Sequence, residues 1–374
     1  MVWIICSALL CLIAGVPAAL LLYRKLRQAK IASALKIENE QGIVEERFIP
    51  IGGIEQWISI RGEDRNNPVV LVIHGGPASC YSIFTPHLRS WENHFTIVQW
   101  DQRGAGKTFA KMGPYGSGEI SMKRLTRDAI EVSEYLRTHL HRDQIFLLAS
   151  SMGSTFGLQV VRSRPDLFYA YIGTDQNVGM ARGREENHRQ VLDRLREHGM
   201  TKGIKALEQI GSNPTLWTHR DFKIVAQWTM KSDPTGYHRT IKLLKDAVWY
   251  APEWKLRDVR AFVKGMNFSL EQLLPEIVRY DAWAAGTRFE IPIFFFQGEN
   301  DVLTLPSQAK SYFNDIHAPL KHMEMISDAG HFAAFLQPEQ FLEDLLTYVR
   351  PLAYASGKRL FTANIDQEAM PSEV

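Results

Sequence analysis

The feature that most constrains the fold is a short stretch at residues 144–154 (QIFLLASSMGS), where an apolar run ends in a small-x-Ser-x-Gly turn. The apolar run predicts a buried β-strand, and the residues after the turn predict a helix. Ser151 stands at the apex, between Ala149 and Gly153, because larger side chains in so sharp a turn would collide with neighbouring backbone. Ser150 fits less well, since its second following residue is a bulky methionine. A strand that breaks directly into a helix pushes the hydroxyl of Ser151 out beyond the edge of the sheet.

Two further predicted strands end in side chains that can activate a serine. The run IPIFFF at residues 291–296 leads to Asp301, and KHMEMI at 321–326 leads to His331. A serine hydroxyl is a weak nucleophile until a base removes its proton. A histidine can act as that base, and a buried carboxylate fixes its tautomer. The order Ser151, Asp301, His331 therefore predicts a catalytic triad at strand ends. Two other carboxylates lie close in sequence and are alternative acids, although Asp301 fits a Gly-x-x-Asp spacing best: Glu299 and Asp328.

A loop that could stabilise a developing negative charge follows another predicted strand. Residues 69–73 (VVLVI) deliver the sequence HGGP at positions 74–77. Glycine in such a loop lets the backbone approach a substrate carbonyl and point an N–H group at it. We assign this donor to Gly76, with Gly75 as the alternative, and pair it with the amide of Met152. Together these two groups are the predicted oxyanion hole.

The sequence WDQRGAG at residues 100–106, together with HGGP, resembles proline iminopeptidases and their α/β-hydrolase relatives. The resemblance continues through SMGST, YIGT, GEND and APLK to Gly330-His331, and it covers most of residues 45–350. It implies an α/β fold of the α/β-hydrolase type, in which a mostly parallel sheet is flanked by helices and carries an inserted helical cap. It also implies that the loop DQRG at residues 101–104 is mainly architectural and braces the region beside the active site, so that Asp101 and Arg103 are support residues.

The cap is expected at residues 178–287, where helical periodicity replaces the alternation of strands and helices. Proline iminopeptidases use acidic residues to hold the free amine of the substrate, and the resemblance suggests Asp175, Glu185 and Glu186 for this role. A solvated helix face is the alternative for the two glutamates. Five tryptophans fall in this segment, and one or two are expected to face the substrate: Trp217, Trp228, Trp249, Trp254 and Trp283.

The expected organisation has six parts. Residues 1–30 form an anchor with a basic flank, 31–43 a polar linker, and 44–177 the first part of the core, with strands near 44–49 and 54–60 and helices at 125–140 and 153–163. The cap follows at 178–287. Residues 288–350 form the second part of the core, and 351–374 a polar tail.

The N-terminal segment predicts a membrane anchor. Residues 2–23 contain no charged side chain and would measure about 33 Å as a helix, which is enough to cross a bilayer. Four basic residues follow, and the positive-inside rule then places the catalytic domain in the cytoplasm: Arg24, Lys25, Arg27 and Lys30. A cleaved signal peptide and a buried helix are the alternatives.

Composition excludes several other functions. The net charge is +2 over 374 residues, with charges spread along the chain, so nothing indicates a nucleic-acid partner. GAGKT at residues 104–108 imitates a phosphate-binding loop, but Asp101 occupies the position that requires glycine. His139 and His141 lack neighbouring ligands, so we expect neither a metal nor another cofactor. Of three cysteines, only Cys80 falls in the folded part, which excludes a disulfide there.

The sequence therefore predicts a membrane-anchored serine hydrolase that cleaves an amide or ester bond through an acyl-enzyme. By resemblance, the expected substrate is a small peptide with a free N-terminus, as for an aminopeptidase. A carboxylesterase or lipase acting on apolar acyl substrates is the alternative. A catalytically silent binding module is less favoured, because no member of the triad is missing.

Overall fold

The computed structural model describes residues 2–354 apart from 181, 183 and 253, and the side chains of residues 2–14 and 234 also lie outside the described part. Of the tail predicted at 351–374, residues 355–374 are therefore outside the description. The residues before them form a short 3₁₀ turn, η6 (Arg350–Ala353).

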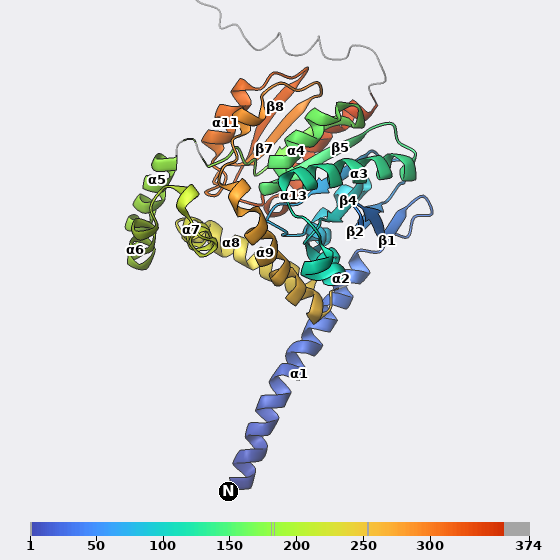
Figure 1. The fold of residues 1–374 in the computed structure, drawn as a ribbon. Helices are drawn as coiled ribbons and strands as arrows, with labels where there is room; N and C mark the ends of the chain where they lie inside the picture. The colour runs from blue at the N-terminus through green and yellow to red at the C-terminus, as the bar shows by residue number, and fades with distance from the viewer. Residues whose placement is uncertain (1, 181, 183, 253, 355–374) are drawn as a thin grey trace, which may run out of the picture.

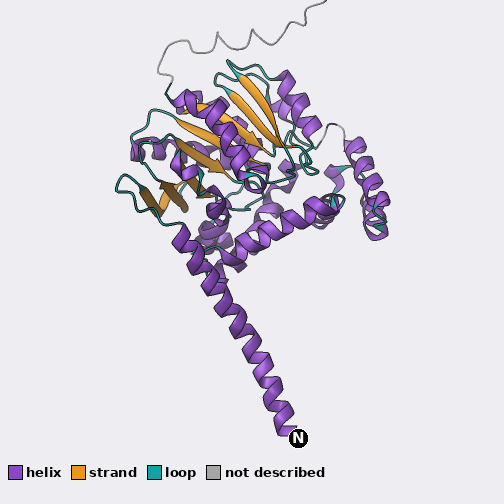
Figure 2. Cartoon of the chain, turned by 180° about the vertical axis from the view of Figure 1, so that it is seen from behind, coloured by secondary structure: helices purple, strands orange, loops and turns teal. Residues whose placement is uncertain are grey.

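One twisted sheet of eight strands organises the described part of the chain (Figures 1 and 2). Its spatial order is β1-β2-β4-β3-β5-β6-β7-β8. The first two strands form an antiparallel hairpin, β2 pairs antiparallel with β4, and all later pairs are parallel. The strands are β1 (Ile43–Ile51), β2 (Ile54–Gly62), β3 (Val69–Ile73), β4 (Thr96–Asp101), β5 (Ile145–Ser150), β6 (Phe168–Thr174), β7 (Ile293–Gly298) and β8 (Lys321–Ile326). The predicted mostly parallel α/β sheet is confirmed.

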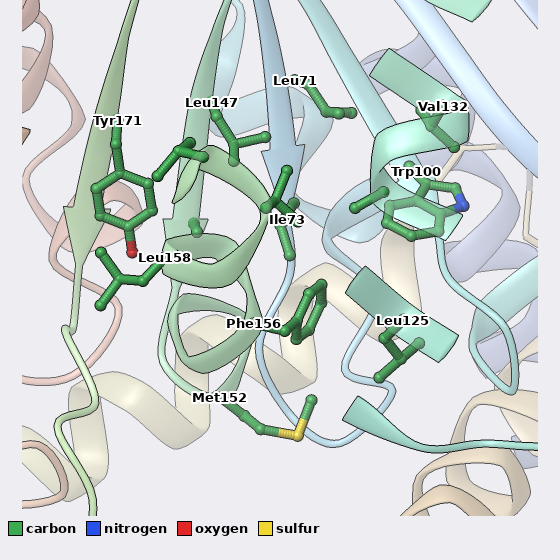
Figure 3. Packing of buried hydrophobic residues seen from close by; sticks show 14 of the residues in the cluster. Leu71, Ile73, Trp100, Leu125, Val132, Leu147, Met152, Phe156, Leu158 and Tyr171 are labelled. Carbon is green, nitrogen blue, oxygen red and sulfur yellow. The ribbon is translucent and has the colours of Figure 1, made fainter. Parts of the chain in front are cut away.

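Helices cover both faces of this sheet, so the central strands are buried along their whole length. Alternate residues of one strand pack against opposite layers. Leu71 and Ile73 of β3 face α3 (Met122–Leu140) and α4 (Met152–Ser163), and Figure 3 shows Ile73 between Leu71 and Phe156. Val70 and Val72 point to the other layer. The other layer contains η1 (Tyr81–Leu88), η2 (Trp91–Asn93), α12 (Ala333–Leu336), α13 (Pro338–Asp344) and η5 (Leu345–Val349).

The helical cap lies between β6 and β7. It comprises α5 (Arg184–Glu197), α6 (Thr201–Ile210), η4 (Pro214–Leu216), α7 (His219–Lys231), α8 (Pro234–Tyr250), α9 (Leu256–Ile277) and α10 (Ala282–Ala285). In Figure 1, α5 and α6 stand at the outer end of the cap, whereas α9 lies beside α2 (Gly106–Gly116) of the core. The remaining helices of the core are η3 (Pro165–Leu167) and α11 (Pro306–Asp315).

The chain begins with one long helix, α1 (Val2–Ala34), which projects away from the sheet (Figures 1 and 2). Within the described residues, no helix combines the length and the apolar character needed to cross a membrane. Much of the predicted anchor, residues 2–14, has side chains outside the described part. The helix also continues to Ala34, so the linker expected from residue 31 is wrong over its first four positions.

The basic flank of α1 is partly built into the cap. Arg24 is buried and donates hydrogen bonds to the carbonyls of Trp249 (2.8 Å) and Trp254 (2.7 Å). One turn later, Gln28 donates to the carbonyls of Ala251 (2.6 Å) and Trp254 (3.0 Å). These bonds satisfy carbonyls of the last turn of α8 and of the loop that follows it, and they fix α1 to the cap.

Candidate active site

Ser151 stands in a strained turn between β5 and α4. Its backbone has φ 52° and ψ −127°, a conformation that side chains other than glycine rarely adopt. The amide of Ser151 donates to the carbonyl of Thr174 on the next strand (3.1 Å). This geometry raises the serine above the carboxyl edge of the sheet, as the sequence pattern predicts.

The small residues around the turn are needed for close packing. A Cβ at Gly153 would lie 2.5 Å from the carbonyl oxygen of His74 and 2.9 Å from that of Ile73. The unusual Ala149 fits because the facing helix has Gly157, where an added Cβ would lie 2.8 Å from that of Ala149. One glycine of the pair is enough, which explains why alanine is accommodated at the first position of the turn.

The structure brings Ser151, His331 and Asp301 together in one line. His331 Nε2 lies 3.0 Å from Ser151 Oγ, and His331 Nδ1 lies 2.9 Å from Asp301 Oδ2. The carboxylate is buried and also accepts hydrogen bonds from the amides of Leu303 (2.8 Å) and Thr304 (3.0 Å). Glu299 and Asp328, the alternative acids, are not hydrogen-bonded to this histidine among the described contacts. The observed geometry therefore matches that of a serine-histidine-aspartate triad.

The charges of this group are coupled. Burial alone would raise the pKa of Asp301. The charge of His331, with the hydrogen bonds that Asp301 accepts from His331 and Thr304, outweighs burial and holds the pKa of Asp301 below its usual range. Burial alone would lower the pKa of His331, but the charges of Asp301 and then Asp175 outweigh it and hold that pKa above 6.5. The site thus stabilises an imidazolium, which is the charged form that a triad histidine takes when it accepts the serine proton.

Both predicted oxyanion donors lie at the cavity beside Ser151. Met152 is the first residue of α4, so its amide has no partner within the helix. Gly76 lines the same cavity as Ser151, Met152 and His331, whereas Gly75 is absent from the described lining. This arrangement favours Gly76 over its neighbour.

The loop after β4 braces the oxyanion loop. Gln102 donates its amide side chain to the carbonyl of His74 (3.0 Å). Asp101 is buried and accepts a hydrogen bond from the amide of Lys107 at the start of α2 (2.7 Å). Arg103 pairs with buried Asp128 (2.9 Å). Asp101 and Arg103 thus occupy the supporting positions that the resemblance implies.

Asp175 lies behind the triad, away from the substrate side. It is 1% exposed and has φ 48°. Its Oδ2 accepts a hydrogen bond from Ser150 Oγ (2.8 Å), and its Oδ1 accepts from the amides of Phe332 (3.0 Å) and Ala333 (3.2 Å). The expectation that Asp175 holds a substrate amine is therefore not supported by its position. It fixes the backbone that follows His331, a role that the sequence analysis missed.

The two glutamates suggested for the substrate amine are on the outer side of α5. Glu185 and Glu186 are exposed, and Glu186 pairs with Arg189 one turn along the helix. Neither lines the cavity above Ser151. Solvent, rather than substrate, surrounds these carboxylates because α5 turns its other face inward.

A cavity of about 440 Å³ opens above Ser151 and extends under the cap. Its walls are mainly apolar side chains of α7 and α9, such as Phe222, Val225, Phe262 and Met266. Among the cap tryptophans, Trp217 lines it. The expectation that one or two tryptophans face the substrate therefore fits this one residue. A partly open cavity with apolar walls and polar groups that converge on one end of it is typical of a small-molecule site.

The remaining tryptophans are occupied elsewhere. Trp228 packs against Gly203 of α6, and Trp254 is buried against Phe262. Trp249 lies under the guanidinium of Arg24, and the indole of Trp283 donates to Asp315 (2.7 Å).

Comparisons with known proteins agree with this geometry. Residues 68–338 match the model of a family described as the alpha/beta hydrolase fold. A Bacillus subtilis (strain 168) protein named "Probable aminopeptidase YbaC" is 26% identical over 322 residues, covering 84% of this chain and 99% of its own. A proline iminopeptidase of Lactobacillus delbrueckii subsp. bulgaricus is 23% identical over 310 residues, covering 81% and 97%. Among solved structures, an esterase from Thermogutta terrifontis superimposes with a TM-score of 0.56 at 17% identity, covering 83% of this chain and 99% of that one.

Proposed function

This chain belongs to the α/β-hydrolase fold family and is proline iminopeptidase-like, and from that premise we propose that it is a serine hydrolase that cleaves an amide or ester bond through an acyl-enzyme. The observation that carries the proposal is the continuous line from Ser151 Oγ through His331 to Asp301, with separations of 3.0 Å and 2.9 Å. The fold does not require these two hydrogen bonds at a strained serine beside an apolar cavity, whereas catalysis by this serine does.

The proposed reaction has two halves. Ser151 Oγ attacks the carbonyl carbon of the substrate while His331 Nε2 takes the hydroxyl proton, and the amides of Gly76 and Met152 hold the resulting oxyanion. The bond to the leaving group breaks, and His331 gives the proton to the departing amine or alcohol. Water then attacks the acylated serine, with His331 first removing its proton and then returning one to Ser151.

Labelling with a fluorophosphonate probe tests this proposal directly. The wild type should be labelled, and Ser151→Ala should not, with kcat lower by about 10⁴-fold or more on any accepted substrate. Ser311→Ala is the matched control, because this serine is exposed on α11, and it should be labelled like the wild type. Equal labelling of wild type and Ser151→Ala would refute the serine nucleophile and favour a catalytically silent binding module.

The substrate is proposed at two levels. The names of the relatives support an aminopeptidase that acts on peptides with a free N-terminus. The apolar walls of the cavity support a second candidate, an esterase of apolar acyl substrates. Rates on proline, alanine and leucine anilides, measured beside short and long acyl esters, separate the two. An absence of turnover on every anilide would remove the aminopeptidase.

We also propose that the N-terminal segment attaches the enzyme to a membrane with its catalytic domain in the cytoplasm. The support is the uncharged sequence of residues 2–23, the basic residues after it, and the projection of α1 away from the sheet (Figure 1). Full-length protein should stay in the membrane pellet after alkaline carbonate extraction. In intact cells, a C-terminal tag should resist protease added outside, and it should be degraded once the cell membrane is permeabilised. Release by carbonate would argue against an inserted anchor.

A further inference from the structure

The inner face of α5 brings positive charge to the substrate cavity. Positions 184, 187, 188, 191 and 194 follow one another at helical spacing and all line the cavity, so they form one face of the helix. Two of them are arginines, the exposed Arg184 and the half-buried Arg194, and these carry the positive charge of the face. His188 lies between them, and burial holds its pKa below 6.5. This cationic face looks into a space whose opposite walls are apolar.

Among the described residues, Arg194 has no partner that neutralises its charge. Its side chain is half-buried, and no hydrogen bond or ion pair joins its guanidinium to another residue in the described part of the chain. The neighbouring Arg196, on the outer face of α5, pairs with Asp193 (2.8 Å) and Glu208 (3.2 Å). Because the guanidinium of Arg194 lines the cavity and its N–H groups are not used by described residues, they are available to an anionic group of a ligand bound there.

Carboxylates are absent from the same surface. No described residue that lines the cavity is an aspartate or a glutamate. Asp175 and Asp301 lie behind His331, where their oxygens accept hydrogen bonds from backbone amides and hydroxyl groups. Arg184 is held only by a long contact to Asn213 Oδ1 (3.4 Å), which leaves most of its donors available. The described cavity is therefore electropositive at the α5 end.

We propose that the natural substrate carries an anionic group, a carboxylate or a phosphate, and that Arg194, assisted by Arg184, binds this group while the scissile carbonyl lies at Ser151. The planar guanidinium presents paired N–H donors that match both anions. The apolar walls between the two ends hold the chain that connects the anionic group to the acyl carbon. This inference rests on the proposed function of the same site and names its substrate class.

A binding experiment separates this inference from the catalytic proposal. In the Ser151→Ala background, calorimetry measures the affinity of monomethyl suberate, dimethyl suberate and methyl 8-aminooctanoate, which differ in the charge of one end. The carboxylate compound should bind best and the ammonium compound worst. Adding Arg194→Ala should weaken only the carboxylate compound, by about tenfold or more. Methyl 8-(phosphonooxy)octanoate, whose anionic group lies at the end far from the ester carbonyl, is a fourth ligand that tests phosphate against carboxylate. Loss of affinity for either anion upon Arg194→Ala supports the inference.

The matched control is Arg196→Ala, which removes the same charge from the outer face of α5 and should leave all affinities unchanged. Circular dichroism checks that each variant is folded. Equal affinity of the neutral and anionic compounds, or equal losses for both in Arg194→Ala, would overturn the inference. Failure of the wild type to react with fluorophosphonate would instead count against the catalytic proposal, because the calorimetry does not depend on turnover.

Discussion

Asp175 offers the sharpest test of the electrostatics of this site. It is buried behind the triad. One carboxylate oxygen of Asp175, one of Asp301 and one ring nitrogen of His331 all lie within 4.8 Å of one another. Burial raises the pKa of Asp175 to about 6, so above this value it carries a negative charge beside the histidine. Replacing it with asparagine removes the charge and retains an oxygen that can accept from the amides of Phe332 and Ala333.

The sign of the expected effect follows from the role of the histidine. His331 acts as a base only when it is neutral, so kcat/KM should rise as pH increases through the pKa of His331. The neighbouring carboxylates hold that pKa above 6.5. Removing the charge of Asp175 destabilises the imidazolium, which lowers the pKa of His331 and moves the acid limb of the profile to lower pH.

The size of the shift can be bounded. At the upper limit of 4.8 Å for their separation, and with an effective dielectric constant of about 20, the attraction between the two charges is about 3.5 kcal/mol, or roughly 2.5 pH units. The amide keeps part of the interaction through its dipole, so we expect Asp175→Asn to move the acid limb of kcat/KM by about one to two pH units toward acid.

The assay is a pH profile of kcat/KM on whichever ester or anilide the wild type hydrolyses. Asp328→Asn is the matched control, because this carboxylate lies three residues before His331 but is exposed and pairs with Arg239 at the surface. Its limb should stay in place. An acid limb that does not move in Asp175→Asn, with the plateau preserved, would refute the charge argument. A lower plateau without a shift would reduce Asp175 to a residue that only positions the backbone.

Three further predictions concern stability and reactivity. Gly153→Ala places a Cβ 2.5 Å from the carbonyl oxygen of His74, so urea denaturation should show a free energy of unfolding lower by about 2–3 kcal/mol. The control Gly116→Ala places its Cβ 3.3 Å from a flexible methionine side chain and should leave the free energy of unfolding nearly unchanged. Equal losses in the two variants would contradict the packing argument. Arg24→Ala removes two hydrogen bonds to carbonyls of the cap and should cost about 2 kcal/mol in the same assay, whereas the exposed Lys25→Ala should change nothing. Cys80 is fully buried and its pKa is raised, first by burial and then by the nearby negative charge, so a thiol reagent at pH 8 should leave it unmodified in a folded variant that lacks the other two cysteines. Rapid modification there would mean that the region beside β4 opens readily.

The arrangement of Ser151, His331 and Asp301 could be predicted from the sequence because the residues next to each of them determine where it lies. Each of Ser151, Asp301 and His331 comes shortly after the end of a predicted strand, and parallel strands bring their carboxyl ends to one edge of the sheet. The position of a residue relative to its own strand therefore determines its place in the site. The antiparallel hairpin at the start of the sheet follows the same logic, since Gly52 and Gly53 adopt the positive φ values that its turn requires.

Other features depend on partners far away in sequence. The resemblance suggests Asp175 for a substrate amine, but its partners are Ser150 Oγ and the backbone amides at positions 332 and 333, and no pattern in the sequence indicates these amides. The linker expected from residue 31 begins with IASA, a sequence without proline or glycine to stop the preceding helix. The contact of Arg24 with the cap likewise depends on carbonyls more than 200 residues away.

The substrate is where the sequence and the structure lead in different directions. The names of the relatives imply a free amine, whereas the described lining of the cavity carries two arginines, neutral polar side chains and apolar walls, and no carboxylate that could pair with an ammonium. At a distance of about 7 Å from one guanidinium, with an effective dielectric constant of about 20, an ammonium would be repelled by about 2 kcal/mol, which lowers its affinity roughly thirtyfold. A carboxylate of the same length gains a similar amount. The affinities for the carboxylate and the ammonium compound should thus differ by about a thousandfold. We therefore expect the sign of the charge on a substrate to affect its binding more than the choice between an amide and an ester.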